Sequence, residues 1–453
     1  MSKIERGLFY LLLLTFPLNL GKHFILRQSY VNGVLVDYLI PTIYLSDLLI
    51  WLLFLSSLLT LYRLRPSPRD LLIKLKNYTP IFIFLFFLLP SVLVASSKMA
   101  AAYKFFKYLE FSFLGILIAE KFNKDLAEKS FKFLTLGVVF QSALAILQWL
   151  KQGYIFGYLP LGESLISPHS PFALVNLLGS MKLRVYGTFP HPNILGGYLS
   201  ISLTIIISYL FIKFISHRCY YDSNHSSKGK LLFFLSIALG AASLFLTFSR
   251  SAWFVFLLGL LLVLILFRKY IGRKTFLISL VLLFSVLLFP LFSVSKTLVG
   301  DNSLSISRRL ELTAASFSMF KDFPLSGVGL NNFTVRLEDY KFIVGVTRFI
   351  QPAHNIYLLV LSESGLLGLT GFLILILAAF RKAYRSRMNR LGIVILVSLL
   401  QLLFLGLFDH YLLTLQQGML IFWILIGIAL SLKSLSLPVE GNFPRMNGSG
   451  REI

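Results

Sequence analysis

Residues 351–368 have the sequence QPAHNIYLLVLSESGLLG and close the longest polar interruption in an otherwise apolar chain, which covers residues 296–368. The same interruption holds two adjacent arginines and a Gly-Val-Gly sequence. His354 stands directly before an apolar run that is long enough to be a membrane helix. The order of these residues predicts a polar loop that delivers a histidine and several arginines to the mouth of a helix, which suggests a site for a phosphate-bearing lipid.

The composition is that of a membrane protein. Of the 453 residues, 57% are hydrophobic and only 14% are charged, and the mean hydropathy is +0.79. Continuous apolar runs such as 81–89 and 257–267 recur without the alternation of a membrane β-strand. The sequence therefore predicts an all-α integral membrane protein. The net charge of +24 fits the excess of basic residues in cytoplasmic loops and gives no reason to expect nucleic acid as a partner.

About 12 apolar segments are long enough to be transmembrane helices. They are 7–21, 38–62, 79–96, 100–119, 131–150, 194–215, 231–249, 251–267, 275–294, 356–380, 391–408 and 413–432. With both termini in the cytoplasm, most of the 43 Lys and Arg residues fall in short inner loops, as the positive-inside rule requires. No signal-peptide cleavage site follows the first segment, so we expect it to be retained as a helix.

This orientation leaves two long loops, 151–193 and 295–355, on the outer face. We divide the chain into N-terminal transmembrane helices (1–150), a membrane domain that includes the second outer loop (151–435) and a tail (436–453). The tail is rich in Gly and Asn, and we expect it to be flexible.

The basic residues on the outer face need an explanation, because the topology does not use them. Arg184 and His191 flank Pro192-Asn193, which either only starts a helix or forms a helix N-terminus that binds an anion. Arg250, in Ser-Arg-Ser-Ala-Trp, lies between two short apolar runs. It either extends to the interface, with Trp253 as an interfacial anchor, or faces inward and binds phosphate. We favour the second interpretation.

The second outer loop carries its own candidates. Arg308 and Arg309 open a helix-like segment that Pro324 ends, although two arginines on a loop helix usually belong to a solvated face. On a helix that begins near Asn355, Glu363 lies roughly 12 Å below His354, and a glutamate inside a membrane is by default functional or paired.

Two further features are open to a structural interpretation. Gly365 and Gly368, three residues apart, fit a close-packing helix face as well as a functional motif. Asp409, at the outer end of the eleventh segment, either orients a base or caps a helix.

Several kinds of motif are absent from the sequence. It has no Asp-x-Asp, no His-Glu-x-x-His and no Walker loop. We therefore expect no metal ligands, no cofactor and no direct coupling to ATP.

Together these motifs resemble the O-antigen ligase and polymerase superfamily of bacterial membrane proteins. His354-Asn355, nine residues and Gly365-Leu-Leu-Gly368 match the ligase signature of His, then Asn, Ser or Gln, nine residues and Gly-x-x-Gly. Arg250 resembles the family's Ser-Arg element, and Arg309 resembles the arginine before Pro-Leu-x-Gly-Val-Gly, here residues 324–329.

The match has limits. Asp409 corresponds only by rough position to an acidic residue of the family, and Thr313 stands where many relatives carry tryptophan. Arg308 beside Arg309 leaves the choice of arginine open. The motifs cover roughly residues 180–430, and the remainder resembles the family only in topology.

The resemblance implies a multi-pass enzyme of a bacterial cytoplasmic (inner) membrane, which moves a glycan from undecaprenyl diphosphate to a lipid or glycan acceptor on the outer face. It implies His354 as the base or acceptor-orienting residue, Arg250 and Arg309 on the diphosphate, and Arg184 as a weaker contact. The supporting residues would be Asn355, Asp409, Glu363 and Arg308. The chemistry fits, because arginine forks stabilise phosphate oxygens without a metal, and histidine is the commonest general base.

Three functions remain open from the sequence. A ligase would move a whole glycan to a new acceptor, and a polymerase of the same superfamily would extend a lipid-linked surface polysaccharide. A transporter of the same lipid-linked glycan would favour inverted repeats and charges near the midplane. The charges here cluster at the outer face, so we rank the transporter last.

Overall fold

The computed structural model describes residues 1–168, 172–177, 179–217, 227–268, 272–274, 276–281, 302–340 and 350–432. The helices are α1 (Lys3–Thr15), α2 (Leu45–Leu64), α3 (Pro68–Lys76), α4 (Thr79–Val94), α5 (Lys98–Lys121), α6 (Lys124–Lys151), α7 (Tyr158–Leu161), α8 (Pro192–His217), α9 (Ser227–Leu246), α10 (Arg250–Leu266), α12 (Asn302–Asp322), α13 (Phe333–Arg336), α14 (Ile356–Arg385), α15 (Arg390–Phe408), α16 (Tyr411–Thr414) and α17 (Gln416–Ser431). Short strands form three antiparallel pairs: β1 (Gly21–His23) with β4 (Thr42–Tyr44), β2 (Tyr30–Val31) with β3 (Val34–Leu35), and β5 (Leu174–Leu177) with β6 (Ser180–Leu183).

The predicted helical membrane fold is confirmed, but the predicted number of spans is not. In the described ranges five helices are long and apolar enough to cross a membrane: Leu45–Leu64, Lys124–Lys151, Pro192–Lys213, Ile356–Arg385 and Arg390–Phe408. A sixth is added if α3 and α4, bent by 79°, form one span. The helices α1, α10 and α17 are too short, and α5 carries three charged residues in its central part. Most of the predicted span 275–294, and the whole tail 436–453, lie outside the described residues.

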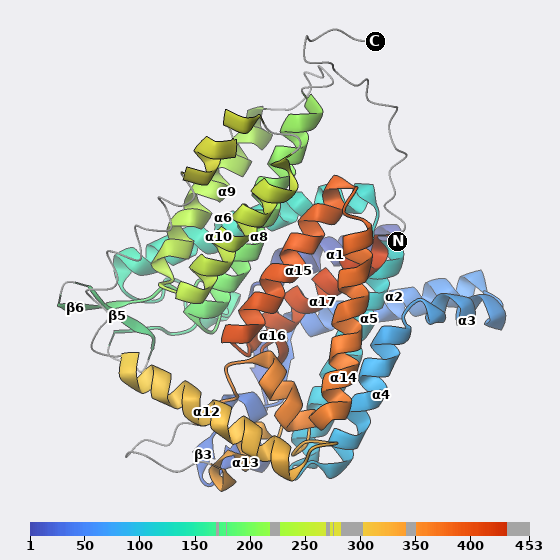
Figure 1. Ribbon diagram of the computed structural model, residues 1–453, viewed down its shortest axis with the longest axis vertical. Helices are drawn as coiled ribbons and strands as arrows, with labels where there is room; N and C mark the ends of the chain where they lie inside the picture. Colours follow the sequence, from blue (N-terminus) through green and yellow to red (C-terminus); the bar gives the residue numbers. More distant parts are fainter. Residues whose placement is uncertain are drawn as a thin grey trace.

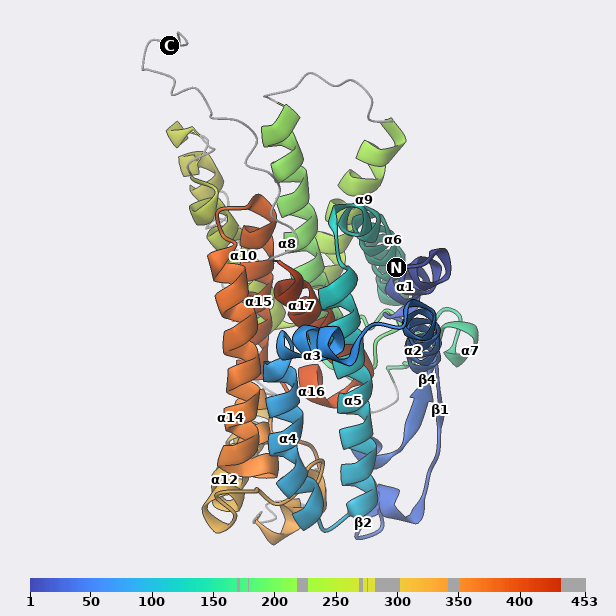
Figure 2. The ribbon, with the colours of Figure 1, turned by 90° about the vertical axis from the view of Figure 1, so that its right-hand side faces the viewer.

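The helices are arranged so that loops and short elements gather at one end. Figure 1 shows α12, α13 and β3 together at this end, with α8, α9 and α10 extending toward the opposite end. In Figure 2, α4, α5 and α14 stand side by side, and β1 and β4 run along the flank of the molecule. We call the end that holds α12, α13 and β3 the loop end.

The N-terminal segment 21–44 folds at the loop end instead of joining a span. The second predicted span, 38–62, therefore begins late, at Leu45, because Asp37–Leu39 is a 3-10 helix and Thr42–Tyr44 is a strand. The turn between β2 and β3 is Asn32-Gly33, with φ of 47° and 83°. Positive φ at both central residues is what a two-residue hairpin turn requires, and Asn-Gly is its preferred sequence.

The helix α14 is broken at Gly365, where φ is 60° and ψ is −161°. The loop 324–330 takes up the backbone groups that the break releases: Leu366 donates to the Pro324 carbonyl at 2.8 Å, and Val328 donates to the Ser362 carbonyl at 2.9 Å. A Cβ on Gly365 would lie 2.3 Å from the carbonyl carbon of Leu325. The glycine is therefore needed for close packing, as one of the two interpretations of this motif predicted.

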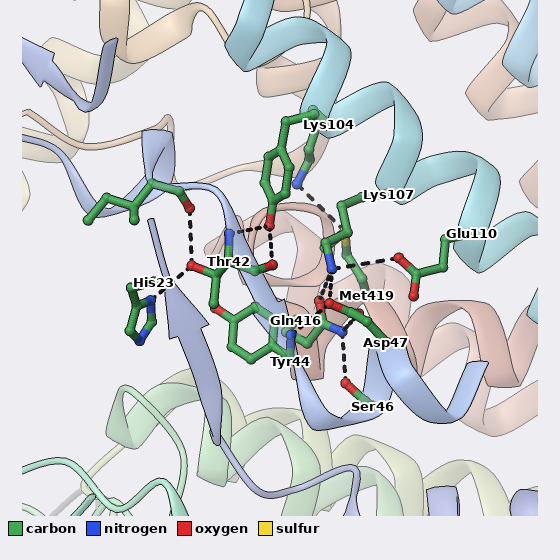
Figure 3. A network of polar contacts seen from close by, with 12 residues as sticks. His23, Thr42, Tyr44, Ser46, Asp47, Lys104, Lys107, Glu110, Gln416 and Met419 are labelled. Atoms are coloured by element: carbon green, nitrogen blue, oxygen red, sulfur yellow. Dashed lines mark hydrogen bonds and ion pairs between the residues drawn. The ribbon is translucent and has the colours of Figure 1, made fainter. Parts of the chain in front are cut away.

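A network of buried charges joins three helices (Figure 3). Lys107 of α5 pairs with Asp47 of α2, and it lies 3.6 Å from the carboxylate of Glu110. Gln416 of α17 donates to Asp47 and, at 2.8 Å, to Ser46. Membrane interiors admit such charges only where they are paired, so this network fixes α2 against α5 and α17.

Candidate active site

The structure brings together polar side chains from four separate segments at the loop end. His354 precedes α14, and Asp409 and His410 lie between α15 and α16. His191 lies directly before α8, and Arg309 lies on α12. One nitrogen of His354, one nitrogen of His410 and one oxygen of Asp409 all lie within 4.8 Å of one another. We call His354, Asp409 and His410 the central cluster.

His354 is placed by the residue that follows it. The Asn355 side chain accepts hydrogen bonds from the N–H groups of Tyr357 and Leu358 and so caps α14. It also donates to the Leu407 carbonyl at 3.3 Å, which ties the start of α14 to the end of α15. His354 is thus not the cap. Its Nδ1 is buried and has no hydrogen-bond partner among the described residues.

The Asp409 carboxylate is held by two donors. One oxygen accepts from the N–H of His410 at 2.9 Å, and the other accepts from the Asn193 side chain at 3.0 Å. The oxygen of the Asn193 side chain accepts from Arg184 at 2.8 Å. Asn193 therefore connects Arg184 to the Asp409 carboxylate. The predicted helix start at Pro192-Asn193 contributes to the site through the Asn193 side chain.

The three histidines of the site are neutral at pH 7. Burial lowers the pKa of His354 below its ordinary 6.5, with Arg309 acting in the same direction and Asp409 opposing it. Burial also lowers the pKa of His191 to about 4 and that of His410 to about 3. Each neutral imidazole keeps one lone pair that accepts a proton or a hydrogen bond.

Asp409, in contrast, is ionised. Burial alone raises the pKa of its carboxyl group, but His410, His354, His191 and the Asn193 hydrogen bond outweigh burial, and the pKa falls below its usual range. A neutral base therefore lies beside a carboxylate that stabilises the base once it is protonated.

Two of the predicted arginines act directly on the central cluster. Arg309 is half-buried and donates to the Phe408 carbonyl at 3.5 Å, one residue before Asp409. Arg184 donates to the Thr247 carbonyl at 2.7 Å and to Asn193, and burial lowers its pKa only to about 10, so it stays charged. The positive charges of both arginines also lower the pKa of His191, so both lie near this histidine.

The other two arginines differ in position. Arg250 is exposed at the first residue of α10, and its charge lowers the pKa of Arg184. It is therefore near the site but on the surface, and is not packed inside the bundle as we expected. Trp253, an interfacial anchor in the alternative interpretation, donates from its indole N–H to the Leu244 carbonyl at 2.8 Å inside the α9–α10 hairpin. Arg308 is half-buried on α12 beside Arg309.

Glu363 lies away from the central cluster and holds the Gly-Val-Gly loop. Its carboxylate accepts the N–H groups of Asn331 at 3.0 Å and of Phe333 at 3.2 Å. Its own carbonyl accepts the N–H of Gly329 at 3.0 Å. Of the two alternatives stated for a glutamate inside a membrane, functional or paired, Glu363 fits the paired one. It holds the Gly-Val-Gly loop and does not belong to the central cluster.

The central cluster is also the one group of possible metal ligands among the described residues. Sequence spacing did not predict it, because His354 and Asp409 are far apart in the chain. Two of its three residues are already engaged: both carboxylate oxygens of Asp409 accept hydrogen bonds, and His410 Nδ1 lies 2.7 Å from the Thr414 hydroxyl. Two guanidinium groups close by compete with a divalent cation.

Two residues of the site were missed from the sequence. His410 packs its ring edge against His354, with 5.1 Å between ring centroids. Tyr38, from the N-terminal segment, packs against the other side of His410, with 5.3 Å between centroids. The polar pair Asp409-His410 in the sequence was a signal that could have identified His410. Nothing in the sequence near Tyr38 marks Tyr38 as a residue of the site.

Comparison with known families agrees with the site. Residues 235–373 match the model of the O-antigen ligase family, a range that contains Arg250, Arg309, His354 and both glycines of the motif. The resemblance to the O-antigen ligase and polymerase superfamily that the motifs indicated is thereby confirmed for this part of the chain. Arg184, Asp409 and Tyr38 lie outside the matched range. A search of curated proteins finds no match to the chain.

Proposed function

We propose that the protein transfers a glycan from undecaprenyl diphosphate to an acceptor hydroxyl, as an O-antigen ligase does. The observation that carries the proposal is a neutral His354, whose buried Nδ1 has no hydrogen-bond partner among the described residues, beside an ionised Asp409 and near the guanidinium of Arg309. A base, a group that stabilises the protonated base, and a cation for the leaving group are the parts that this transfer needs.

In the proposed reaction the acceptor oxygen attacks the anomeric carbon of the donor sugar. The new carbon–oxygen bond forms while the bond to the diphosphate breaks, and the acceptor proton passes to His354. The departing undecaprenyl diphosphate keeps the electron pair of the broken bond. Arg309, with Arg250 and Arg184, stabilises the charge that grows on the diphosphate, because arginine forks bind phosphate oxygens bidentately.

The energy of the reaction resides in the sugar–diphosphate bond, so neither ATP nor a metal ion is required. We place the loop end on the outer face of the cytoplasmic membrane, because the inner loops are then the short basic ones. A polymerase would use the same donor and base, and would differ in accepting a second lipid-linked glycan.

The test is the substitution His354→Asn. Asn355 supplies the helix cap, so the variant should insert and fold normally and still bind the lipid-linked donor. Because an amide takes up no proton at neutral pH, transfer should slow at least ~10²-fold, the lower end of general-base contributions. His23→Asn, an exposed histidine of β1, serves as the matched control and should transfer normally.

Near-normal transfer by the His354 variant would overturn the assignment of the base. Chain length on the product then separates the two family activities: a polymerase lengthens the lipid-linked glycan, whereas a ligase moves it to a different lipid.

A further inference from the structure

We infer that Tyr38, presented by the N-terminal segment 21–44, forms the acceptor-binding wall of the site and contacts the sugar that receives the glycan. The inference rests on the proposed function and assigns a part of the chain outside the range that matches the O-antigen ligase family.

The first observation is the position of the ring. Tyr38 meets His410 edge to face, with 5.3 Å between centroids and 81° between planes. His410 meets His354 in the same way, at 5.1 Å and 82°. His410 thus contacts both the proposed base and Tyr38, and a single ring links Tyr38 to the base.

The second observation is that the segment holding Tyr38 is fastened to the loop that carries the site. The side chain of Asn331 donates to the Tyr38 carbonyl at 3.3 Å, and Asn32 contacts Glu338. An apolar cluster joins the two parts of the chain: Val31, Val36, Leu39 and Ala100, with Tyr38, Val335 and Ile350 packed against it.

The other end of the segment is anchored in the helices (Figure 3). The Tyr103 hydroxyl donates to the Thr42 carbonyl at 2.9 Å and accepts from the Thr42 N–H at 3.1 Å. Four and five residues further on, Ser46 and Asp47 belong to the buried charge network. Tyr38 is therefore held at both ends, as a residue that contacts substrate must be.

The third observation is the distribution of charge. The cations Arg309 and Arg184 lie on the Asp409 side of the cluster, with Asn193 as a link. The charges that act on the Tyr38 hydroxyl are those of Asp409 and Asp37, both negative. The two cations attract a diphosphate, whereas the charges of the described residues that act on the Tyr38 hydroxyl are both negative. The Tyr38 side suits an uncharged polyol.

The chemistry of tyrosine suits the same ligand. Its ring offers an apolar surface to the C–H face of a sugar, and its hydroxyl forms hydrogen bonds with sugar hydroxyls. Burial, together with the two carboxylates, raises the pKa of this hydroxyl, so it remains a protonated donor.

The experiment uses the full-length protein in lipid nanodiscs with a fluorescent, undecaprenyl-diphosphate-linked glycan. The acceptor is the total glycolipid extract of the host membrane, titrated at saturating donor. Two products are measured together: glycan transferred to glycolipid and glycan released to water. Their ratio reports acceptor binding and does not depend on how much of the protein is folded.

Tyr38→Ala should lower the transfer-to-release ratio about tenfold, since an aromatic contact contributes up to ~1.5 kcal/mol. The donor concentration for half-maximal release should not change. Tyr38→Phe keeps the ring and should retain most of the ratio. Tyr30→Ala, an exposed tyrosine of the same segment, is the matched control and should behave as wild type.

An unchanged ratio in Tyr38→Ala, or a loss of donor binding equal to the loss of acceptor binding, would overturn the inference and leave Tyr38 as packing for His410. A wild-type protein that transfers to nothing in the extract, or a His354→Asn variant that transfers normally, would instead contradict the proposed function itself.

Discussion

The Asn193 side chain donates to the Asp409 carboxylate over 3.0 Å and thereby joins the start of α8 to the end of α15. Because the same asparagine accepts from Arg184, one amide fixes both the carboxylate that faces His354 and a cation of the site. The protonation of His354 therefore depends on a contact between two helices that are far apart in sequence.

The pH dependence of transfer follows from this contact. The pKa of His354 lies below 6.5, so transfer should be constant near pH 7 and fall as the pH drops through that lowered pKa and the base becomes protonated. The negative charge of Asp409 raises the pKa of His354, so Asp409→Asn should move the acidic fall in kcat/KM to lower pH while reducing the maximal rate. If the acidic fall in kcat/KM stayed at the same pH in Asp409→Asn, the protonation of His354 would not be coupled to Asp409.

The arginines should differ in their response to substitution. Arg309→Ala should reduce transfer ~10²-fold or more, and Arg309→Lys should restore little, because lysine lacks the planar fork. Arg308→Ala should have a much smaller effect, since Arg309 is the one that reaches the Phe408 carbonyl beside Asp409. Initial rates with labelled donor check this. If Arg308→Ala reduced transfer strongly and Arg309→Ala reduced it only slightly, the roles assigned to the two arginines would have to be exchanged.

Metal removal tests the alternative use of the central cluster. Transfer should be unchanged after dialysis against EDTA, because hydrogen bonds already occupy both Asp409 oxygens and arginines stabilise the leaving group. If EDTA abolished transfer and added Zn²⁺ or Mg²⁺ restored it, His354, Asp409 and His410 would be metal ligands instead.

The buried charge network should be critical for stability. Lys107→Met leaves Asp47 as a buried charge without its cation and should cost ~3–5 kcal/mol of folding free energy. The double variant Asp47→Asn, Lys107→Met should recover part of that loss. Lys129→Met, which removes an exposed pair with Asp125, is the control and should change stability by less than ~1 kcal/mol. Unfolding in detergent at increasing temperature measures all three, and equal effects of the two lysine variants would refute the network's role.

The break in α14 makes Gly365 hard to replace. Gly365→Ala adds a Cβ that would lie 2.3 Å from the backbone of Leu325, at a φ that side chains disfavour. We expect a loss of more than ~2 kcal/mol and little folded protein. Gly7→Ala, whose Cβ meets nothing within 4 Å, should fold normally. Fluorescence-detected size-exclusion chromatography compares the two, and equal yields would contradict the packing described here.

Periodicity and motifs predicted the helices well and the contacts between them poorly. A helix-like segment opened by Arg308 and ended by Pro324, and a helix start near Asn355, followed from local residue chemistry, and the structure has these helices at Asn302–Asp322 and from Ile356. The count of about 12 spans is not confirmed, because several apolar helices among the described residues are shorter than a span. The polar pair Asp409-His410 and the helix start at Pro192-Asn193 were visible in the sequence, but the contacts that join them come from tertiary packing. No local pattern marks Tyr38.

The break at Gly365 also sets the height of the site relative to a bilayer. An unbroken helix from Ile356 to Arg385 would measure ~45 Å, far more than a hydrocarbon core of ~30 Å. From Leu366 to Arg385 the length is ~30 Å, so the part beyond the break matches the core by itself. In the proposed orientation, the shorter part of α14 stands outside the hydrocarbon core and carries His354 at its start. The proposed reaction between a lipid-borne diphosphate and a water-soluble glycan would then have its base outside the acyl chains.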